Sequence, residues 1–161
     1  MAEFKTNVMR LLEKEKINFN AYEYEHNQEA VDGITVAQKI NKPLNLVFKT
    51  LVAIGANQNK KEYYVFVIPV AEELNLKRAA ISVKEKSISL VAIKDLLKIT
   101  GYVRGGCSPL GMKKKFKTVI SSLALKNETI IVSAGKIGYQ IEISPLALQN
   151  LINCVFDDIT I

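Results

Sequence analysis

The sequence is poor in the side chains that usually carry metal or redox chemistry. Its 161 residues include one histidine, His26, two cysteines, Cys107 and Cys154, and no tryptophan. Structural zinc sites take four Cys or His ligands at short spacings, so these three remote residues predict no metal site. They also make no disulfide framework. We therefore expect a cytoplasmic protein with free thiols that uses no metal and no cofactor.

Long apolar segments are lacking as well. No stretch reaches the roughly 18 apolar residues from which a membrane-spanning helix is inferred, so no membrane partner is expected. Residues 1–16 have an amphipathic pattern without a small-residue cleavage site, which predicts a helix and not a signal peptide. Apolar residues make up 48% and charged residues 24%, as in ordinary globular proteins. With no repeat or linker, residues 1–161 are predicted to form one domain.

The net charge is positive but modest, at +6 from 22 Lys and Arg against 16 Asp and Glu. Such an excess is equally consistent with solubility, and it is too small to predict a protein that coats DNA. Its distribution is more informative. Lys113, Lys114, Lys115 and Lys117 directly follow a glycine-rich loop, and Arg104 lies just before it. This clustering favours local contact with phosphate groups and no DNA partner.

The hydrophobic pattern predicts a mixed α/β protein of α+β type. Helices are expected at residues 7–15, 36–40, 76–83, 93–99 and 145–150, with Thr6, Thr35, Asn75 and Ser144 as N-caps. Seven strands are expected at residues 19–24, 47–54, 63–68, 88–91, 117–121, 129–133 and 139–143, with an optional eighth at 155–159. Because helices and strands do not alternate strictly, we expect a mixed or barrel-like sheet with helices packed outside.

Lys49 stands in the middle of an apolar strand, on the same face as Val47 and Leu51. Burial of an unpaired ammonium costs several kcal/mol, roughly, so lysine is rare at such a position. Lys49 is either an edge-strand lysine whose ammonium reaches water or a donor at the mouth of a pocket. In the second case it would donate to a phosphate or a carbonyl oxygen. The strand pattern leaves both interpretations open.

Six of the eight glycines lie between positions 101 and 138. Glycine is favoured where φ is positive or where a ligand approaches the backbone. Gly105 and Gly106 provide consecutive amides that can bind an anion or form an oxyanion hole for acyl chemistry. A structural turn explains the same pair equally well. The loop matches neither the phosphate-loop pattern nor the dinucleotide fingerprint.

A protein nucleophile cannot be assembled from the sequence. Cys107 would need a base, and the one histidine, His26, lies on a distant segment. Cys154 stands in the apolar stretch LINCVF and is expected in the core. No Ser-His-Asp set or carboxylate pair stands out. An enzyme with this sequence would act by positioning, by backbone donors and by groups of the substrate itself.

Four segments together resemble the successive motifs of the YbaK family, which is related to the editing domains of prolyl-tRNA synthetases. They are residues 24–26 (YEH), 47–51 (VFKTL), 101–111 (GYVRGGCSPLG) and 132–136 (VSAGK). Their order and approximate spacing hold from residue 11 to residue 158. The combination of the FKTL strand with the GGxSPLGxKK loop is specific, whereas either piece alone is not.

The resemblance implies a role for several residues. Lys49 corresponds to the family's active-site lysine, which holds the terminal nucleotide or the acyl ester. Tyr24 corresponds to the neighbouring aromatic wall, and Gly105 and Gly106 to the glycines that approach the substrate. The family has no nucleophile of its own, which agrees with a sequence from which no protein nucleophile can be assembled.

The opposite glycine loop contributes Ser133 and Gly135 to the implied substrate site, together with Gln140. The family pattern often has an aspartate where this chain has Gln140, which removes a carboxylate near the implied site. Cys107 stands where an aliphatic residue is common, and it is expected to pack as a small hydrophobic residue.

The function that the resemblance implies is free-standing hydrolytic editing of mischarged aminoacyl-tRNA. The first expectation is Cys-tRNA(Pro) deacylation in which the substrate's own thiol attacks its carbonyl. The alternatives are an Ala-tRNA(Pro) deacylase and a binding module for a nucleotide or tRNA end without turnover. The expected partners are the CCA end of tRNA and prolyl-tRNA synthetase.

Overall fold

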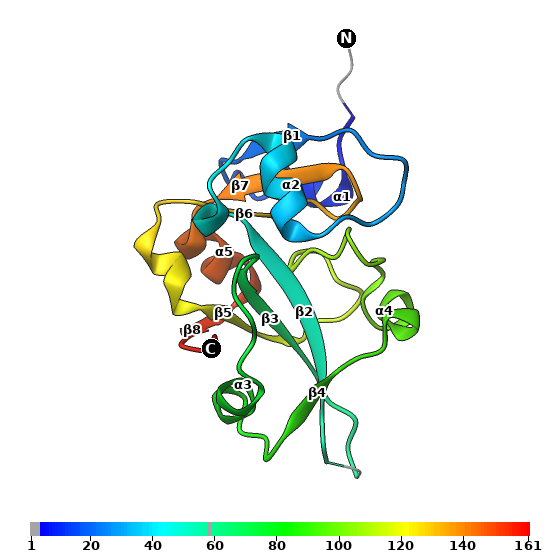
Figure 1. The fold of residues 1–161 in the computed structure, drawn as a ribbon, viewed down its shortest axis with the longest axis vertical. Coiled ribbons are helices and arrows are strands. Elements are labelled where there is room, and N and C mark those ends of the chain that lie inside the picture. The colour runs from blue at the N-terminus through cyan, green and yellow to red at the C-terminus, as the bar shows by residue number, and fades with distance from the viewer. Residues whose placement is uncertain (1–3, 58) are drawn as a thin grey trace.

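A computed structural model describes residues 4–57 and 59–161 (Figure 1). These residues form five α-helices, eight strands and two short 3-10 helices. The helices are α1 (Asn7–Lys14), α2 (Gly33–Ile40), α3 (Leu76–Ser82), α4 (Ile93–Thr100) and α5 (Pro145–Ile152), with η1 (Leu44–Leu46) and η2 (Ser122–Lys126). The strands are β1 (Asn20–Glu23), β2 (Phe48–Gly55), β3 (Tyr63–Pro69), β4 (Ile88–Leu90), β5 (Lys117–Ser121), β6 (Ile130–Ser133), β7 (Tyr139–Ile143) and β8 (Val155–Asp157).

The larger sheet has five strands in the order β4-β2-β3-β5-β8. The pairs β2–β3 and β2–β4 are antiparallel, whereas β3–β5 and β5–β8 are parallel. This combination confirms the predicted mixed sheet. The optional eighth strand is present as β8, although it ends two residues earlier than the pattern suggested.

The smaller sheet has three antiparallel strands in the order β1-β7-β6. A single parallel bridge from Val47 to Ile131 joins the start of β2 to β6. Figure 1 shows β1, β6, β7 and α2 gathered at one end of β2, while α3 and β4 lie at the other end. One strand therefore connects two differently built ends of the molecule.

The main core lies between the two sheets and is closed by α1 and α5. It is built on side chains from both sheets and both helices, among them Leu12, Val65, Ile130, Ile141 and Leu148. On β3, Phe66 and Ile68 point to the other face, where Ala79 and Ala80 of α3 cover them. Because both faces of β3 are covered, the strand is apolar throughout and shows no alternation.

Side-chain caps fix the starts of the helices. Thr6, Asn75 and Ser144 accept backbone amides as predicted. The prediction for α2 was wrong, because Asp32 and not Thr35 is its N-cap. Asp32 Oδ1 accepts the Thr35 amide at 2.8 Å and Oδ2 accepts the Thr35 hydroxyl at 3.0 Å, so the helix begins three residues earlier than expected.

Within the described residues, no helix is both long and apolar enough to cross a membrane.

Candidate active site

A cleft of about 480 Å³ opens where the start of β2 meets the smaller sheet. Four segments that are far apart in the sequence form its walls: the loop before α2, the first half of β2, the glycine-rich loop after α4, and the facing strands β6 and β7. The volume lies within the range of roughly 300–1,000 Å³ that is usual for small-ligand sites. The lining residues include Ala30, Asp32, Gly33, Lys49, Thr50, Val70, Arg104, Gly105, Cys107, Ser133 and Gln140.

Lys49 lies in this cleft and is half-buried. Its Nζ donates to the carbonyl oxygen of Val70 at 3.4 Å, across the end of the β2–β3 pair. No carboxylate lies within ion-pair distance of this ammonium among residues 4–57 and 59–161. One long hydrogen bond leaves donor capacity for a ligand, since an ammonium has three N–H groups.

Gly105 lines the cleft in a left-handed conformation, with φ of +85°. A Cβ at this position would lie 2.8 Å from the Cβ of Ala30, so a side chain would close the gap between the two loops. Within the described part of the chain, the Gly105 amide has no intramolecular partner. It is therefore available to an acceptor in the cleft.

Gly106 does not line the cleft. Its amide donates to the Val103 carbonyl at 3.0 Å and thereby closes a turn. A Cβ on Gly106 would stand 3.1 Å from the amide nitrogen of Ile137, so the glycine allows the two glycine loops to pack backbone to backbone. The structural explanation for the glycine pair thus applies to Gly106, and only Gly105 presents its backbone to the cleft.

Ser133 and Gln140 face each other across the β6–β7 ladder, and both line the cleft. Both are buried, with exposed fractions of 9% and 5%. The Ser133 Oγ accepts the Gly135 amide at 3.1 Å, which leaves the hydroxyl proton free to be donated. The strands thus contribute a hydroxyl and an amide to the same cleft as Lys49 and Gly105.

Tyr24 and Gly135 do not line the cleft. The Tyr24 hydroxyl is buried and has no hydrogen-bond partner among the described residues. Its ring packs edge-on against His26, which covers Gly138 so closely that a Cβ there would stand 2.1 Å from the imidazole. Tyr24 and His26 thus pack against the second glycine loop, residues 134–138 between β6 and β7.

Tyr102 ties the two glycine loops together. Its hydroxyl donates to the Leu110 carbonyl at 2.5 Å, and its ring lies 3.1 Å from the position of a Cβ on Gly135. Burial raises the pKa of Tyr102 to about 12, so it keeps its proton and its donor role at neutral pH. A side chain at position 135 would crowd the Tyr102 ring, so the close packing of the ring requires Gly135.

Cys107 reaches the cleft but is not poised for attack. Its side chain is buried and belongs to the main core. Burial raises the pKa of the thiol to about 12, although a hydrogen bond from Thr100 opposes the shift. The thiolate is the nucleophilic form of cysteine, so this residue is inert near neutral pH. Cys154 is also buried, as predicted.

The cleft contains residues that the sequence pattern did not single out. These are Asp32 and Gly33, which form one wall at the start of α2. The grouping of Arg104 with the lysines that follow the loop was wrong, because Arg104 lines the cleft and those lysines do not. The Asp32–Thr35 capping pair is a local signal that could have located the first wall. No three of the described His, Cys, Asp and Glu side chains form a group that could hold a metal ion.

The chain belongs to the aminoacyl-tRNA editing domain family, since residues 28–151 match the sequence profile of that family. This confirms the resemblance that the four motifs indicated. All four walls of the cleft lie within the matched range.

Among curated proteins, the chain is similar to EbsC of Enterococcus faecalis, which is provisionally named a Cys-tRNA(Pro)/Cys-tRNA(Cys) deacylase. The two are 42% identical over 156 residues, which cover 97% of this chain and 93% of EbsC.

Solved structures share the fold at lower identity. The hypothetical protein APE2540 superimposes with a TM-score of 0.84 at 18% identity, over 97% of this chain and 100% of the other. A protein described as a candidate trans-editing enzyme for prolyl-tRNA synthetase gives a TM-score of 0.81 at 16% identity, over 99% of both chains. These matches confirm the predicted fold class.

Proposed function

We propose that the chain hydrolyses the ester bond of mischarged aminoacyl-tRNA, with Cys-tRNA(Pro) as its preferred substrate, and that residues 1–161 act as one editing unit. The observation that carries this proposal is the convergence of Lys49, Gly105, Ser133 and Gln140 in one cleft. The thiol that reaches this cleft, that of Cys107, is not activated. The aminoacyl ester at the unpaired 3′ end of a tRNA is a ligand that such a cleft can accept. The name of EbsC supports the choice of acyl group and tRNA.

The chemistry is assisted by the substrate. The thiol of the esterified cysteine loses its proton to solvent, and its sulfur bonds to the ester carbonyl carbon. The bond from that carbon to the ribose oxygen breaks, and the oxygen takes up a proton. Water then opens the cyclic thioester to release cysteine.

The protein stabilises charge and holds the reacting groups in place. The Lys49 ammonium and the Gly105 amide donate to the carbonyl oxygen as it becomes negative. Donors that are fixed in position before the reaction commonly account for about 10²–10³ in rate each. Ser133 and Gln140, on β6 and β7, orient the terminal ribose and the acyl group. Tyr24, Gly106 and Gly135 position the two loops.

The selectivity follows from the size of the cleft and from the thiol. A synthetic site rejects a smaller amino acid poorly, because a missing methylene changes binding by only about 1–3 kcal/mol. A separate cleft that admits only a small acyl group can remove the smaller amino acid after it has been attached to tRNA. Selection of tRNA(Pro) over other tRNAs is supplied by contacts outside the cleft or by prolyl-tRNA synthetase. Aminoacyl-tRNA as the substrate implies work in the cytoplasm.

A comparison of four esters tests the proposal. Cys-, Ala-, Pro- and S-methyl-Cys-tRNA(Pro) are each incubated with enzyme far below the substrate concentration. We expect the cysteinyl ester to be cleaved at least about 100-fold faster than the S-methyl ester, because an intramolecular nucleophile raises effective concentration by orders of magnitude.

Two outcomes would overturn parts of the proposal. Faster cleavage of Ala-tRNA(Pro) than of Cys-tRNA(Pro) would show that water and not the substrate thiol attacks. Survival of every ester while tRNA binding persists would show a binding module and not an enzyme.

A further inference from the structure

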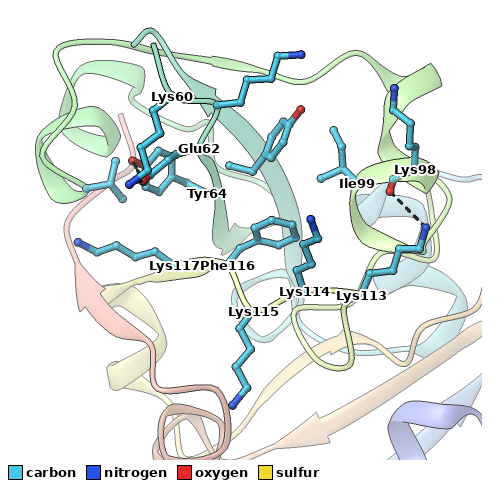
Figure 2. Close-up of a pocket in the computed structure, with 13 residues that line it drawn as sticks. Lys60, Glu62, Tyr64, Lys98, Ile99, Lys113, Lys114, Lys115, Phe116 and Lys117 are labelled. Carbon is cyan, nitrogen blue, oxygen red and sulfur yellow. Dashed lines mark hydrogen bonds and ion pairs between the residues drawn. The ribbon is translucent and has the colours of Figure 1, made fainter. Parts of the chain in front are cut away.

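A second depression, distinct from the cleft, has a volume of about 1050 Å³ and is lined largely by lysine (Figure 2). We call it the lysine groove. Among the residues that the structure describes, seven lysines and one acidic residue, Glu62, line it. The lysines are Lys60, Lys61, Lys98, Lys113, Lys114, Lys115 and Lys117. These residues come from the β2–β3 connection, from α4 and from the segment that leads into β5, so folding assembles the charge from three parts of the chain.

The local charge is high for so small a surface. Seven lysines and one glutamate give the groove a net charge of +6, equal to that of the whole chain. Lys60 forms an ion pair with Glu62 at 2.6 Å, which neutralises both. No other lysine of the groove has an ion-pair partner among the residues that the structure describes. Like charges repel one another when no ligand is bound, so the arrangement favours an anionic ligand.

The groove has two charged walls and an aromatic floor. In Figure 2, Lys98 and Lys113 lie on one side, Lys60 and Lys117 on the other, and Phe116 between them. The ring of Phe116 packs edge-on against Tyr63, with centroids 6.0 Å apart. Separated rows of cations suit an extended backbone of phosphates better than one compact anion.

The groove and the cleft lie at opposite ends of β2. Phe48 and Lys49 line the cleft, whereas Tyr63, which pairs with Ile54, lines the groove. Ile54 lies six positions after Phe48 on the strand, a distance of about 20 Å. That distance corresponds to roughly six nucleotides of a stacked strand at about 3.4 Å each. The segment 98–117 lines both sites, so it connects them directly.

We propose that the lysine groove binds the backbone phosphates of the tRNA acceptor stem, near the point where pairing begins, while the 3′ end occupies the cleft. This inference rests on the proposed function and adds a second RNA-binding surface to it. The groove contributes affinity and orientation but no chemistry. Phosphate contacts of this kind carry no sequence information, so the groove does not select tRNA(Pro).

Matched triple variants test the inference. The groove variant carries Lys61→Gln, Lys98→Gln and Lys114→Gln. The control variant carries Lys14→Gln, Lys77→Gln and Lys126→Gln, three exposed lysines that line neither site, so both variants lose the same charge. Each is assayed with a cysteinylated minihelix, which contains the acceptor stem, and with a cysteinylated CCA trinucleotide, which does not.

We expect the groove variant to raise KM for the minihelix at least tenfold and to leave cleavage of the trinucleotide within twofold of the wild type. The slope of log kcat/KM against log salt should become shallower by about 0.9 for each lost phosphate contact. The control variant should leave both KM for the minihelix and cleavage of the trinucleotide unchanged. Unchanged KM for the minihelix in the groove variant, or an equal rise in the control, would overturn the inference. Failure of the wild type to cleave either substrate would instead overturn the proposed function.

Discussion

The cleft and the lysine groove lie on the same strand pair but are built in opposite ways. The cleft places one half-buried lysine among backbone and side-chain donors from four segments. The groove collects seven lysines, and six of them have no ion-pair partner within the described chain. The difference matches two tasks. Stabilisation of one developing charge requires a few donors at fixed positions, whereas attraction of a polyanion requires many charges and little precision.

Arg104 and the lysines after the loop belong to different sites. The sequence places them around one glycine-rich loop, but the loop turns back on itself at Gly105 and Gly111, both with positive φ. Arg104 therefore lies in the cleft, and Lys113 lies in the groove. The turns at Gly105 and Gly111 thus direct the two ends of the loop to different sites.

The largest expected effect tests the cleft. Lys49→Ala should lower kcat for Cys-tRNA(Pro) by about 10²–10³, because it removes a donor to the developing negative charge. Initial rates at saturating substrate measure this loss. Lys39→Ala changes an exposed lysine on the nearby helix α2 and should leave the rate unchanged. A Lys49→Ala rate close to that of the wild type would contradict the assigned role.

A smaller effect tests the groove through salt. For three phosphate contacts, kcat/KM for the cysteinylated minihelix should fall roughly 40-fold as salt rises from about 50 to 200 mM. The cysteinylated trinucleotide cannot reach the groove, so its kcat/KM should depend on salt much less. Equal salt dependence for the two substrates would show that the cleft alone binds RNA.

The packing of the two glycine loops is tested by Gly106→Ala. The added methyl would stand 3.1 Å from the Ile137 amide nitrogen, and overpacking of this kind commonly costs about 1–3 kcal/mol. Urea denaturation measures the loss in free energy of unfolding. In Gly55→Ala the new methyl meets the Glu85 carboxylate, the end of a flexible side chain, so the loss should be smaller. Equal losses in free energy of unfolding for the two variants would show that the backbone contact between the glycine loops does not make Gly106 more sensitive than Gly55.

The smallest effect concerns Cys107. Cys107→Ser should leave kcat/KM for Cys-tRNA(Pro) within about threefold, because a thiol with a pKa of about 12 is not the nucleophile. Loss of activity in Cys107→Ser would show that the thiol takes part in catalysis.

The pKa shift of Cys107 also has a consequence for stability. The folded chain holds the thiol proton to higher pH than the unfolded chain, in which the ordinary pKa is near 9. The stabilisation is therefore complete below pH 9 and is lost as the pH rises toward 12. The pH profile of the melting temperature should decline over this range, and it should decline less in Cys107→Ser. An identical decline in the two proteins would contradict the shift.

Local patterns predicted most of the fold. The apolar run at β3, the caps Thr6, Asn75 and Ser144, and the strands β5 and β7 all follow from short-range signals. The cap of α2 was misjudged because Asp32 and Thr35 are both good N-caps three residues apart, and their mutual hydrogen bonds decide in favour of Asp32.

The sites were predictable only in part. Lys49, Gly105, Ser133 and Gln140 could be singled out from motifs, and the structure brings them into one cleft. The Asp32–Thr35 pair could have located the start of α2. The approach of that segment to the glycine-rich loop, and the addition of Lys60 and Lys61 to the groove, depend on contacts between segments far apart in the chain. Patterns within short segments carry no information on such contacts.

A single-turnover experiment with excess enzyme separates the two regions most directly. The rate of Cys-tRNA(Pro) deacylation is measured against enzyme concentration for Lys49→Ala and for the groove variant. We expect Lys49→Ala to keep the half-saturating enzyme concentration but to lose about 10²–10³ in the saturating rate. We expect the groove variant to keep the saturating rate but to need at least tenfold more enzyme to reach half of it. The same pattern in both variants would contradict the division between a cleft for chemistry and a groove for RNA.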